Sequence, residues 1–443
     1  MTPELLEQAR AAARLAARHG AQESKVSVSR SRGISVEWRD GRLERLQDRA
    51  QCALHLEVLV DQRYSSNGTN DLRPDALERF VRDAIDMTRL LEPDPQRGLV
   101  DPAHYPRPDE LAIDLDLWDA TQSRVDTEQR IAAARELEER VRAQAGDAPI
   151  VSVSTRAGDG FSVSVQLHSN GFEGVERGTT FSEGASVALR QADGKRPTGS
   201  SYSVRRHRSD LEPRDKLARE ALERAVEQLD SRKLPTGRYT IVVENQAAGR
   251  LLGPLLGPLA GSALQQRRSL WDGKLGQQIA NPLLTLSDEP RTPRTLGATL
   301  WDSDGMAARR RPLLEAGVLR TYLIDPYYAR KLGVEPTGGS THQLAWSLGS
   351  SGLDELIRRA GNGVLIQRFL GGNSNGSTGE LSIGCGGRRI RGGERAEPLA
   401  EINLAANIAT LWTALAALGN DPDPNSAAAC PTCVFEGVQL SGV

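Results

Sequence analysis

Cysteine, long hydrophobic runs and an excess of charge of either sign are all scarce or missing in this sequence. Only four cysteines occur among 443 residues, too few for a disulfide scaffold in so long a chain, which agrees with a reducing compartment. No stretch approaches the ~20 apolar residues that a membrane span needs, and the first residues lack the basic start and apolar run of a signal peptide. We therefore expect a cytoplasmic protein without a membrane partner.

The charge balance is close to neutral. A formal net charge of −2 and a pI near 6.4 give no electrostatic reason to expect nucleic acid as a partner. The hydrophobic content of 38% still permits a globular fold. A chain of this length predicts about two or three domains.

A metal-binding pattern is missing as well. The sequence contains no His-Glu dipeptide, and its histidines stand singly at His19, His55, His104, His168, His207 and His342. Catalytic zinc needs about three protein ligands from His, Asp, Glu or Cys, and an open position for water. This chain is therefore not expected to cleave peptides with a metal of its own.

What is present predicts an α+β protein. Residues 1–92 predict an N-terminal α/β domain, and five prolines mark 93–109 as a linker. The helical and period-two patterns predict helices over 4–19 and from Pro74, and strands around 34–38 and 52–60 with a hairpin at 40–41.

Residues 110–233 predict a central α+β region. Its expected elements are helices over 126–144 and 214–229, strands over 150–154 and 161–167, and a turn at Asn170-Gly171.

Residues 234–443 predict a β-rich domain, a barrel or a sandwich with a few helices. Helical periodicity is mostly lost there, and short apolar runs are separated by Gly, Pro, Asn and Asp. Such runs occur at 283–286, 317–324, 363–369 and 381–383, with a helix expected over 404–418 and a last strand over 434–440.

Segments spread over most of the chain carry a family resemblance. They include Tyr239–Val243, Leu251–Gly257, Ser269–Gly276, Asp302–Gly305, Arg309–Leu319, Tyr328–Gly333, Pro336–Gly339, Ser377–Ser382, Gly386–Pro398, Ala406–Ile408, Leu418–Asp421 and Leu440–Gly442. Near the N-terminus, Arg39–Gly41 and Tyr64–Leu72 match more loosely. Together they resemble the TldD/PmbA family, and its PmbA branch, also called TldE, more than TldD.

The resemblance implies where a metal would bind. In the zinc-bearing TldD branch, a His-Glu-x-x-x-His motif precedes the element that matches Ser269–Gly276 here. Counting back without gaps puts its two histidines on Leu252 and Gly257 and its glutamate on Gly253. None of these residues can bind zinc or activate water.

The resemblance also implies a role. PmbA-type chains are similar to a non-metal subunit paired with a TldD-type zinc subunit. Such a pair degrades or trims unfolded peptides and has been linked to the maturation of modified peptide antibiotics and to antitoxin turnover. The implied partners are a TldD-like chain, in a heterodimer or higher oligomer, and unfolded or modified peptides. Zinc is expected in the partner and no cofactor in this chain.

The segment 371–380 is the most polar loop. Its Asn373, Ser374, Asn375 and Thr378 are candidate residues for the rim of a peptide groove, where exposed backbone could pair with an extended substrate. The alternative is a mobile surface turn. His342, also in a loop, is the one histidine selected as a candidate binding residue, although single histidines are usually structural.

Three further groups of residues allow both a functional and a structural interpretation. Cys430 and Cys433 suggest a redox pair or half a zinc clamp, but two small residues beside a buried last strand explain them better. Arg309–Arg311 indicates a solvated strand or an interface rather than an anion site. Asp302 and Asp304 have the spacing of a loop-stabilising turn.

The leading hypothesis is a non-metal subunit of a TldD/PmbA-type metalloprotease complex, catalytically inactive alone. The alternative is a homodimeric peptide-binding or chaperone-like module without proteolytic activity. A third hypothesis is an independent enzyme that uses Cys430 and Cys433.

Overall fold

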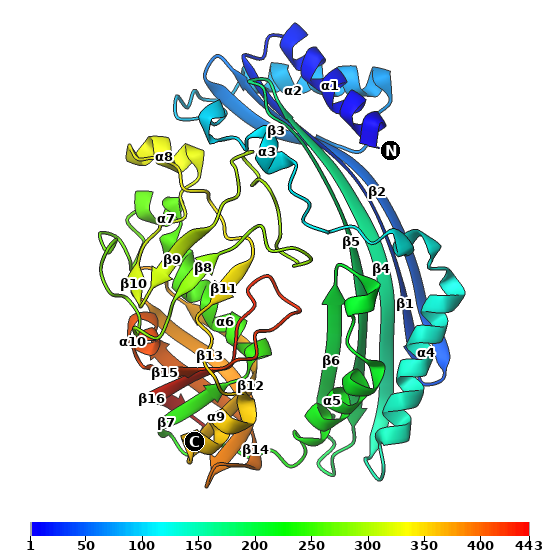
Figure 1. Cartoon of the computed structure of the whole chain (residues 1–443), viewed down its shortest axis with the longest axis vertical. Helices are drawn as coiled ribbons and strands as arrows, with labels where there is room; N and C mark the ends of the chain where they lie inside the picture. The colour runs from blue at the N-terminus through cyan, green and yellow to red at the C-terminus, as the bar shows by residue number, and fades with distance from the viewer. Residues whose placement is uncertain (1, 443) are drawn as a thin grey trace.

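The computed structural model describes residues 2–442 and places them in two lobes that face each other (Figure 1). We call residues 2–226 the N-terminal lobe and residues 237–442 the C-terminal lobe. A long curved sheet with helices forms the first lobe, and a barrel with helices and a small sheet forms the second. The α+β class predicted from the sequence is confirmed.

The N-terminal lobe is built on six antiparallel strands in the order β3-β2-β1-β4-β5-β6. The strands are β1 (Glu23–Arg39), β2 (Arg42–Val60), β3 (Arg63–Thr69), β4 (Ile150–His168), β5 (Glu173–Leu189) and β6 (Thr198–Arg205). The α-helices are α1 (Thr2–Arg18), α2 (Pro74–Thr88), α3 (Pro108–Leu111), α4 (Thr127–Gln144) and α5 (Arg214–Val226). Short 3-10 turns are η1 (Pro102–His104), η2 (Ala120–Arg124) and η3 (Arg208–Asp210).

One sheet joins the first and the central segments of the chain. β1 pairs with β4 from Lys25 opposite His168 to Arg39 opposite Ser154. Residues 1–92 and 110–233 therefore contribute to the same sheet, and the segment between them runs over it. The domain boundaries drawn from the sequence stay a prediction.

β4 replaces the two strands predicted at 150–154 and 161–167. The sequence between them resembles a turn, but the strand continues through it. Asp159 is buried and bound by Arg130 of α4, with 2.6 Å between its Oδ2 and the arginine Nε. A Cβ at Gly160 would lie 2.6 Å from Arg32 O, so glycine is needed where β1 approaches.

Helices cover the two ends of this sheet (Figure 1). α1 and α2 bury Leu5 and Ile85 against β1 and β2 at one end. α4 and α5 bury Leu137 and Leu217 against β4 and β5 at the other end. The predicted helices and the hairpin are present, and Asp40 (φ 48°) and Gly41 (φ 80°) make its tight turn.

The C-terminal lobe contains a small closed barrel. The ring β14-β13-β12-β7-β16 is closed by pairing of β14 with β16, and β15 extends from β16. These strands are β7 (Gly237–Val243), β12 (Gly363–Ser374), β13 (Glu380–Arg391), β14 (Glu394–Asn407), β15 (Leu415–Leu418) and β16 (Cys433–Ser441).

Beside the barrel lies a second, four-stranded sheet in the order β10-β9-β8-β11. Its strands are β8 (Leu286–Asp288), β9 (Arg311–Glu315), β10 (Val318–Leu319) and β11 (Leu344–Trp346). The helices of the lobe are α6 (Asn245–Leu256), η4 (Gly257–Leu259), α7 (Gly261–Gln265), α8 (Pro326–Leu332), α9 (Leu353–Ala360) and α10 (Ile408–Thr413). None of the helices in residues 2–442 is long and apolar enough to cross a membrane.

Two predictions for this lobe are wrong. The helix expected over 404–418 is the end of β14, the short α10 and β15. Asn407 stops the strand and caps α10, accepting a hydrogen bond from Ala409 N at 3.0 Å. Apolar periodicity alone does not separate a short buried strand from a helix.

The second missed feature is α6. Helical periodicity was expected to be lost after Gly237, and Gly249, Gly253 and Pro254 are poor helix formers. The helix nevertheless forms because Leu251 and Leu255, both fully buried, pack into the main core of the lobe.

Ion pairs hold the two lobes together. Arg309 binds Glu110 with 2.7 Å between Nη2 and Oε2, and Arg291 binds the same carboxylate at 2.9 Å. Glu110 is only 3% exposed, and its arginine neighbours hold the pKa of its carboxyl well below the usual range. Of the run Arg309–Arg311, predicted as a solvated strand or an interface, Arg309 makes this contact, while Arg310 and Arg311 bind Glu289 and Asp288 of their own lobe.

Candidate functional site

The strand β12 has a free edge beside α6. β12 runs parallel to β7 only from Val364 to Ile366, after which Glu244 N donates to Ile366 O at 2.9 Å and the chain turns into α6. β12 continues to Ser374 along β13 on its other side. Within residues 2–442, no strand pairs with the α6 side of β12 beyond Ile366.

Two connected hollows follow this free edge, and we call them together the α6–β12 groove. Their volumes are about 530 Å³ and about 410 Å³, and they share Gly249 and Arg250 of α6. The first hollow reaches α5 and β6 of the N-terminal lobe through Arg224 and Tyr202. The second ends at Arg268 and Asn375. The groove thus runs along β12 for roughly 25 Å, at about 3.3 Å per residue.

Glycines form the wall of the groove on the helix side. Gly249 and Gly253 share one face of α6, and Gly257, the first residue of η4, continues the same spacing of four and lines the same hollow. A Cβ at Gly253 or Gly257 would meet no atom within 4 Å, so both positions open onto free space.

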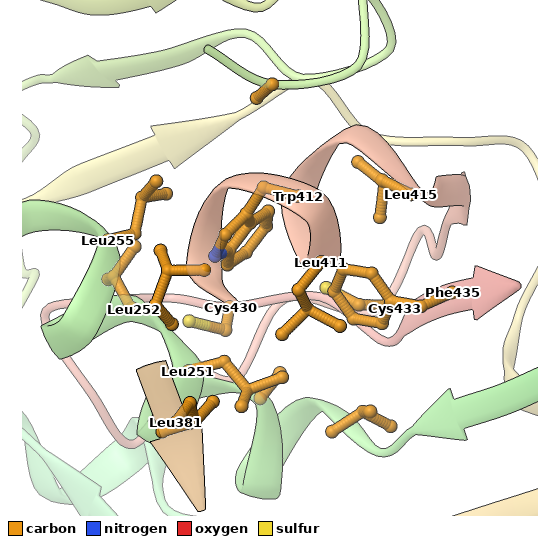
Figure 2. Packing of buried hydrophobic residues seen from close by; sticks show 14 of the residues in the cluster. Leu251, Leu252, Leu255, Leu381, Leu411, Trp412, Leu415, Cys430, Cys433 and Phe435 are labelled. Carbon is orange, nitrogen blue, oxygen red and sulfur yellow. The ribbon is translucent and has the colours of Figure 1, made fainter. Parts of the chain in front are cut away.

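The opposite face of α6 is buried. Leu251, Leu252 and Leu255 point into the core together with Trp412 and Cys430 (Figure 2). Of the three positions that the resemblance selects, Leu252 is thus packed inside and only 5% exposed, while Gly253 and Gly257 face the groove.

The residues of this chain do not fit a catalytic metal. Leucine and glycine offer no ligand atom at the three selected positions. Across residues 2–442, no three side chains from His, Cys, Asp and Glu gather in an arrangement that could hold a metal ion.

Three of the selected polar residues line the groove. Asn373, Ser374 and Asn375 lie along its second hollow, at the end of β12. The Asn375 side chain also shapes the loop, because its Oδ1 accepts hydrogen bonds from Ser377 N at 2.9 Å and Thr378 N at 3.3 Å. Thr378 lies in that turn, behind the lining residues, where its carbonyl accepts from Asn407 Nδ2 at 2.7 Å. The binding roles of these residues stay predictions.

His342 lies apart from the groove. Its Nδ1 is 2.9 Å from Asp288 Oδ2, and Arg311 Nη2 is 3.1 Å from the same oxygen. The His342 Nε2 is buried without a hydrogen-bond partner. The structure does not bring this histidine together with the residues of segment 371–380.

Asp302 and Asp304 form the turn predicted for them. Asp302 Oδ1 accepts hydrogen bonds from Asp304 N at 2.9 Å and Met306 N at 3.0 Å. Burial, and then the neighbouring Asp304, raise the pKa of Asp302 to about 6.

The two cysteines near the last strand are free thiols buried beneath α6. Burial raises the pKa of Cys430 to about 12, and that of Cys433 is also raised well above its usual value. Because the thiolate is the reactive form, this environment disfavours redox or nucleophilic chemistry at either thiol.

No sequence pattern predicts the arginines of the groove. Arg224, Arg250, Arg268 and Arg368 line it from α5, α6, the segment after α7, and β12. They lie up to 144 residues apart in the chain (Arg224 to Arg368; 368 − 224), so only the fold brings them together.

In a comparison with known proteins, three family models match this chain and together cover most of it. Those for the PmbA/TldA metallopeptidase domain 1, central domain and C-terminal domain match residues 25–88, 121–229 and 236–442. The chain is 28% identical to the metalloprotease PmbA of Escherichia coli O157:H7, covering 95% of this chain and 92% of that protein. It is 27% identical to the PmbA homologue of Haemophilus influenzae, covering 97% and 94%.

Solved structures share the whole fold. A candidate modulator of DNA gyrase from Bacteroides thetaiotaomicron superposes with a TM-score of 0.94 at 39% identity, covering 99% of both chains. TldE from Thermococcus kodakarensis superposes with a TM-score of 0.86 at 19% identity, covering 98% of this chain and 100% of that one.

Proposed function

The chain belongs to the PmbA/TldD metallopeptidase family, and from that premise we propose that it is a peptide-holding, non-metal subunit of a TldD/PmbA-type protease complex. A TldD-like partner supplies the zinc and the catalytic glutamate. This chain supplies the α6–β12 groove, in which an unfolded or trimmed peptide lies extended.

One observation carries the proposal. Among the residues with which α6 lines the groove are Gly249, Arg250 and Gly253, and none of its lining residues is a His, Cys, Asp or Glu that could bind a metal. Family membership makes a peptide the expected substrate class, and the residue types on α6 leave this chain without an apparatus to hydrolyse it.

The free edge of β12 explains how a peptide of any sequence could bind. From Gln367 to Ser374, the edge of β12 that faces α6 has no strand partner within residues 2–442, while its other edge pairs with β13. An extended peptide placed there adds a strand, and the main-chain hydrogen bonds do not depend on its side chains. The glycines of α6 leave room for that added strand.

Co-expression with a TldD-type chain that bears the His-Glu-x-x-x-His motif tests this function. The two chains should co-purify and cleave a quenched fluorescent, unstructured peptide, and EDTA should abolish the cleavage. Neither chain alone should match the rate of the pair. Cleavage by this chain alone would contradict the proposal. Peptide binding without any gain in cleavage beside the partner would also contradict it, and would favour the homodimeric binding module.

A groove-filling variant tests the position of the peptide. Ser374→Trp places a large side chain in the second hollow, and we expect the affinity for the peptide to fall roughly tenfold or more, because the added strand is displaced. Ser382→Trp is the matched control. Ser382 is exposed on the neighbouring β13 but does not line the groove. Fluorescence anisotropy measures both affinities, and equal losses would contradict the placement.

A further inference from the structure

The walls of the α6–β12 groove carry positive charge and no negative charge. Arg224, Arg250, Arg268 and Arg368 are among its lining residues, and no aspartate or glutamate is. The chain as a whole has a formal net charge of −2. The groove therefore differs in charge from the average surface of its own protein.

Three of these arginines have no carboxylate partner. Arg224 binds Glu244 with 2.7 Å between Nη2 and Oε1, so its charge is balanced. Arg250, Arg268 and Arg368 make no ion pair within residues 2–442. Elsewhere in the same lobe Arg309, Arg310 and Arg311 each reach a carboxylate, through Glu110, Glu289 and Asp288.

Of the three unpaired arginines, Arg368 gives the strongest indication of an anion-binding position. Its side chain is half-buried on β12 and lies over Gly386 of β13, where an added Cβ would be 2.6 Å from Nη2. Its guanidinium makes no hydrogen bond in the described part of the chain, and burial lowers its pKa. Partial burial of a cation that has no partner costs free energy, and a bound anion would offset part of that cost.

The geometry points to a substrate class: we propose that the groove selects extended peptides rich in aspartate and glutamate. This inference rests on the proposed function and names the peptides that the groove prefers. Side chains of an added strand point alternately to the two sides, so acidic residues two apart in the peptide face the same wall. Their carboxylates can then pair with Arg250, Arg268 and Arg368 while the backbone pairs with β12.

Peptide binding to the full-length chain measures this selectivity. Three labelled peptides of about ten residues would share one sequence except at alternate positions, which carry Glu, Gln or Lys. We expect the Glu peptide to bind roughly tenfold tighter than the Gln peptide at low salt, and the Lys peptide to bind weakest. The preference should shrink as the ionic strength rises, because exposed charges are screened.

Arginine variants locate the effect in the groove. The double variant Arg250→Gln and Arg368→Gln should bind the Glu and Gln peptides with nearly equal affinity while keeping its affinity for the Gln peptide. Arg79→Gln, at an exposed position of α2 outside the groove, should keep the full preference. Circular dichroism and melting curves of both variants would confirm that each is folded.

Three other results would contradict the charge selection, the peptide assignment or the location of the selecting charges. Equal binding of the Glu and Gln peptides to the unaltered chain, with the binding lost in Ser374→Trp, would overturn the charge selection but keep the peptide groove. Tighter binding of a single-stranded oligonucleotide than of the Glu peptide would overturn the peptide assignment itself. Preference for the Glu peptide that survives in the double variant would place the selecting charges elsewhere and overturn the inference.

Discussion

At the scale of single residues, burial raises the pKa of three side chains near α6, namely Cys430, Cys433 and Glu244. Cys430 and Cys433 are about 1% exposed and stay protonated because their pKa values are raised. Glu244, between α6 and the N-terminal lobe, also has a pKa raised by burial, while Arg224 opposes that shift. The two thiols are therefore better understood as core residues, and Glu244 as the ion-pair partner of Arg224, than as catalysts.

Asp302 gives a residue-scale prediction about pH. Burial and then Asp304 raise its carboxyl pKa from 3.8 to about 6. The charged form is thus disfavoured in the fold, and its contribution makes the protein less stable as the pH rises from about 4 to about 6. An asparagine can accept the same backbone hydrogen bonds from Asp304 and Met306 without a charge.

We expect Asp302→Asn to raise the free energy of unfolding at about pH 8 by on the order of 2 kcal/mol. Near pH 4 the variant and the unaltered protein should be almost equally stable, because the aspartate is then largely protonated in the fold. Urea denaturation at the two pH values measures the difference. A loss of stability at the higher pH, or an equal gain at both, would contradict the assignment.

At the scale of elements, local patterns predict what local forces determine. The hairpin at Asp40-Gly41, the start of α2 at Pro74 and the last strand β16 follow from turn chemistry and alternation. α6 and the strand ends around Asn407 do not, because distant packing partners stabilise them against weak local preference.

The candidate site shows the same limit. The polar residues Asn373 to Asn375 can be selected from composition, and the absence of ligands on α6 from residue types alone. The free edge of β12 and the arginines beside it cannot be predicted from the sequence. They depend on β7 ending at Val243 while β12 continues.

Replacing either of two glycines by alanine should change the stability of the protein, in opposite directions. Gly249 lies inside α6, and a Cβ there would meet only Cys430 Sγ at 3.8 Å, an ordinary contact. Gly249→Ala should therefore stabilise the protein by about 0.5–1 kcal/mol, because alanine is the better helix former. In β13, a Cβ at Gly387 would overlap Leu365 O, so Gly387→Ala should destabilise the protein and the barrel.

The midpoints of urea unfolding distinguish the two variants, provided that the slopes are unchanged. A lower midpoint for Gly249→Ala would mean that α6 is not the open-faced helix described here.

At the scale of the whole molecule, the two lobes hold the groove between them without closing it. Its first hollow has residues of α5 and β6 on one side and of α6 and β12 on the other. The ion pairs of Glu110 with Arg309 and Arg291 join the two lobes beside the small four-stranded sheet, close to the start of β9.

The zinc content of the purified proteins tests the central claim most directly. This chain, its TldD-type partner and the co-purified pair would be prepared in zinc-containing medium, desalted and measured by plasma mass spectrometry. We expect almost no zinc on this chain alone and about one zinc for each TldD-type chain, alone or paired, because the His-Glu-x-x-x-His motif belongs to the TldD-type chain. One zinc bound by each copy of this chain in isolation, together with peptidase activity, would contradict it.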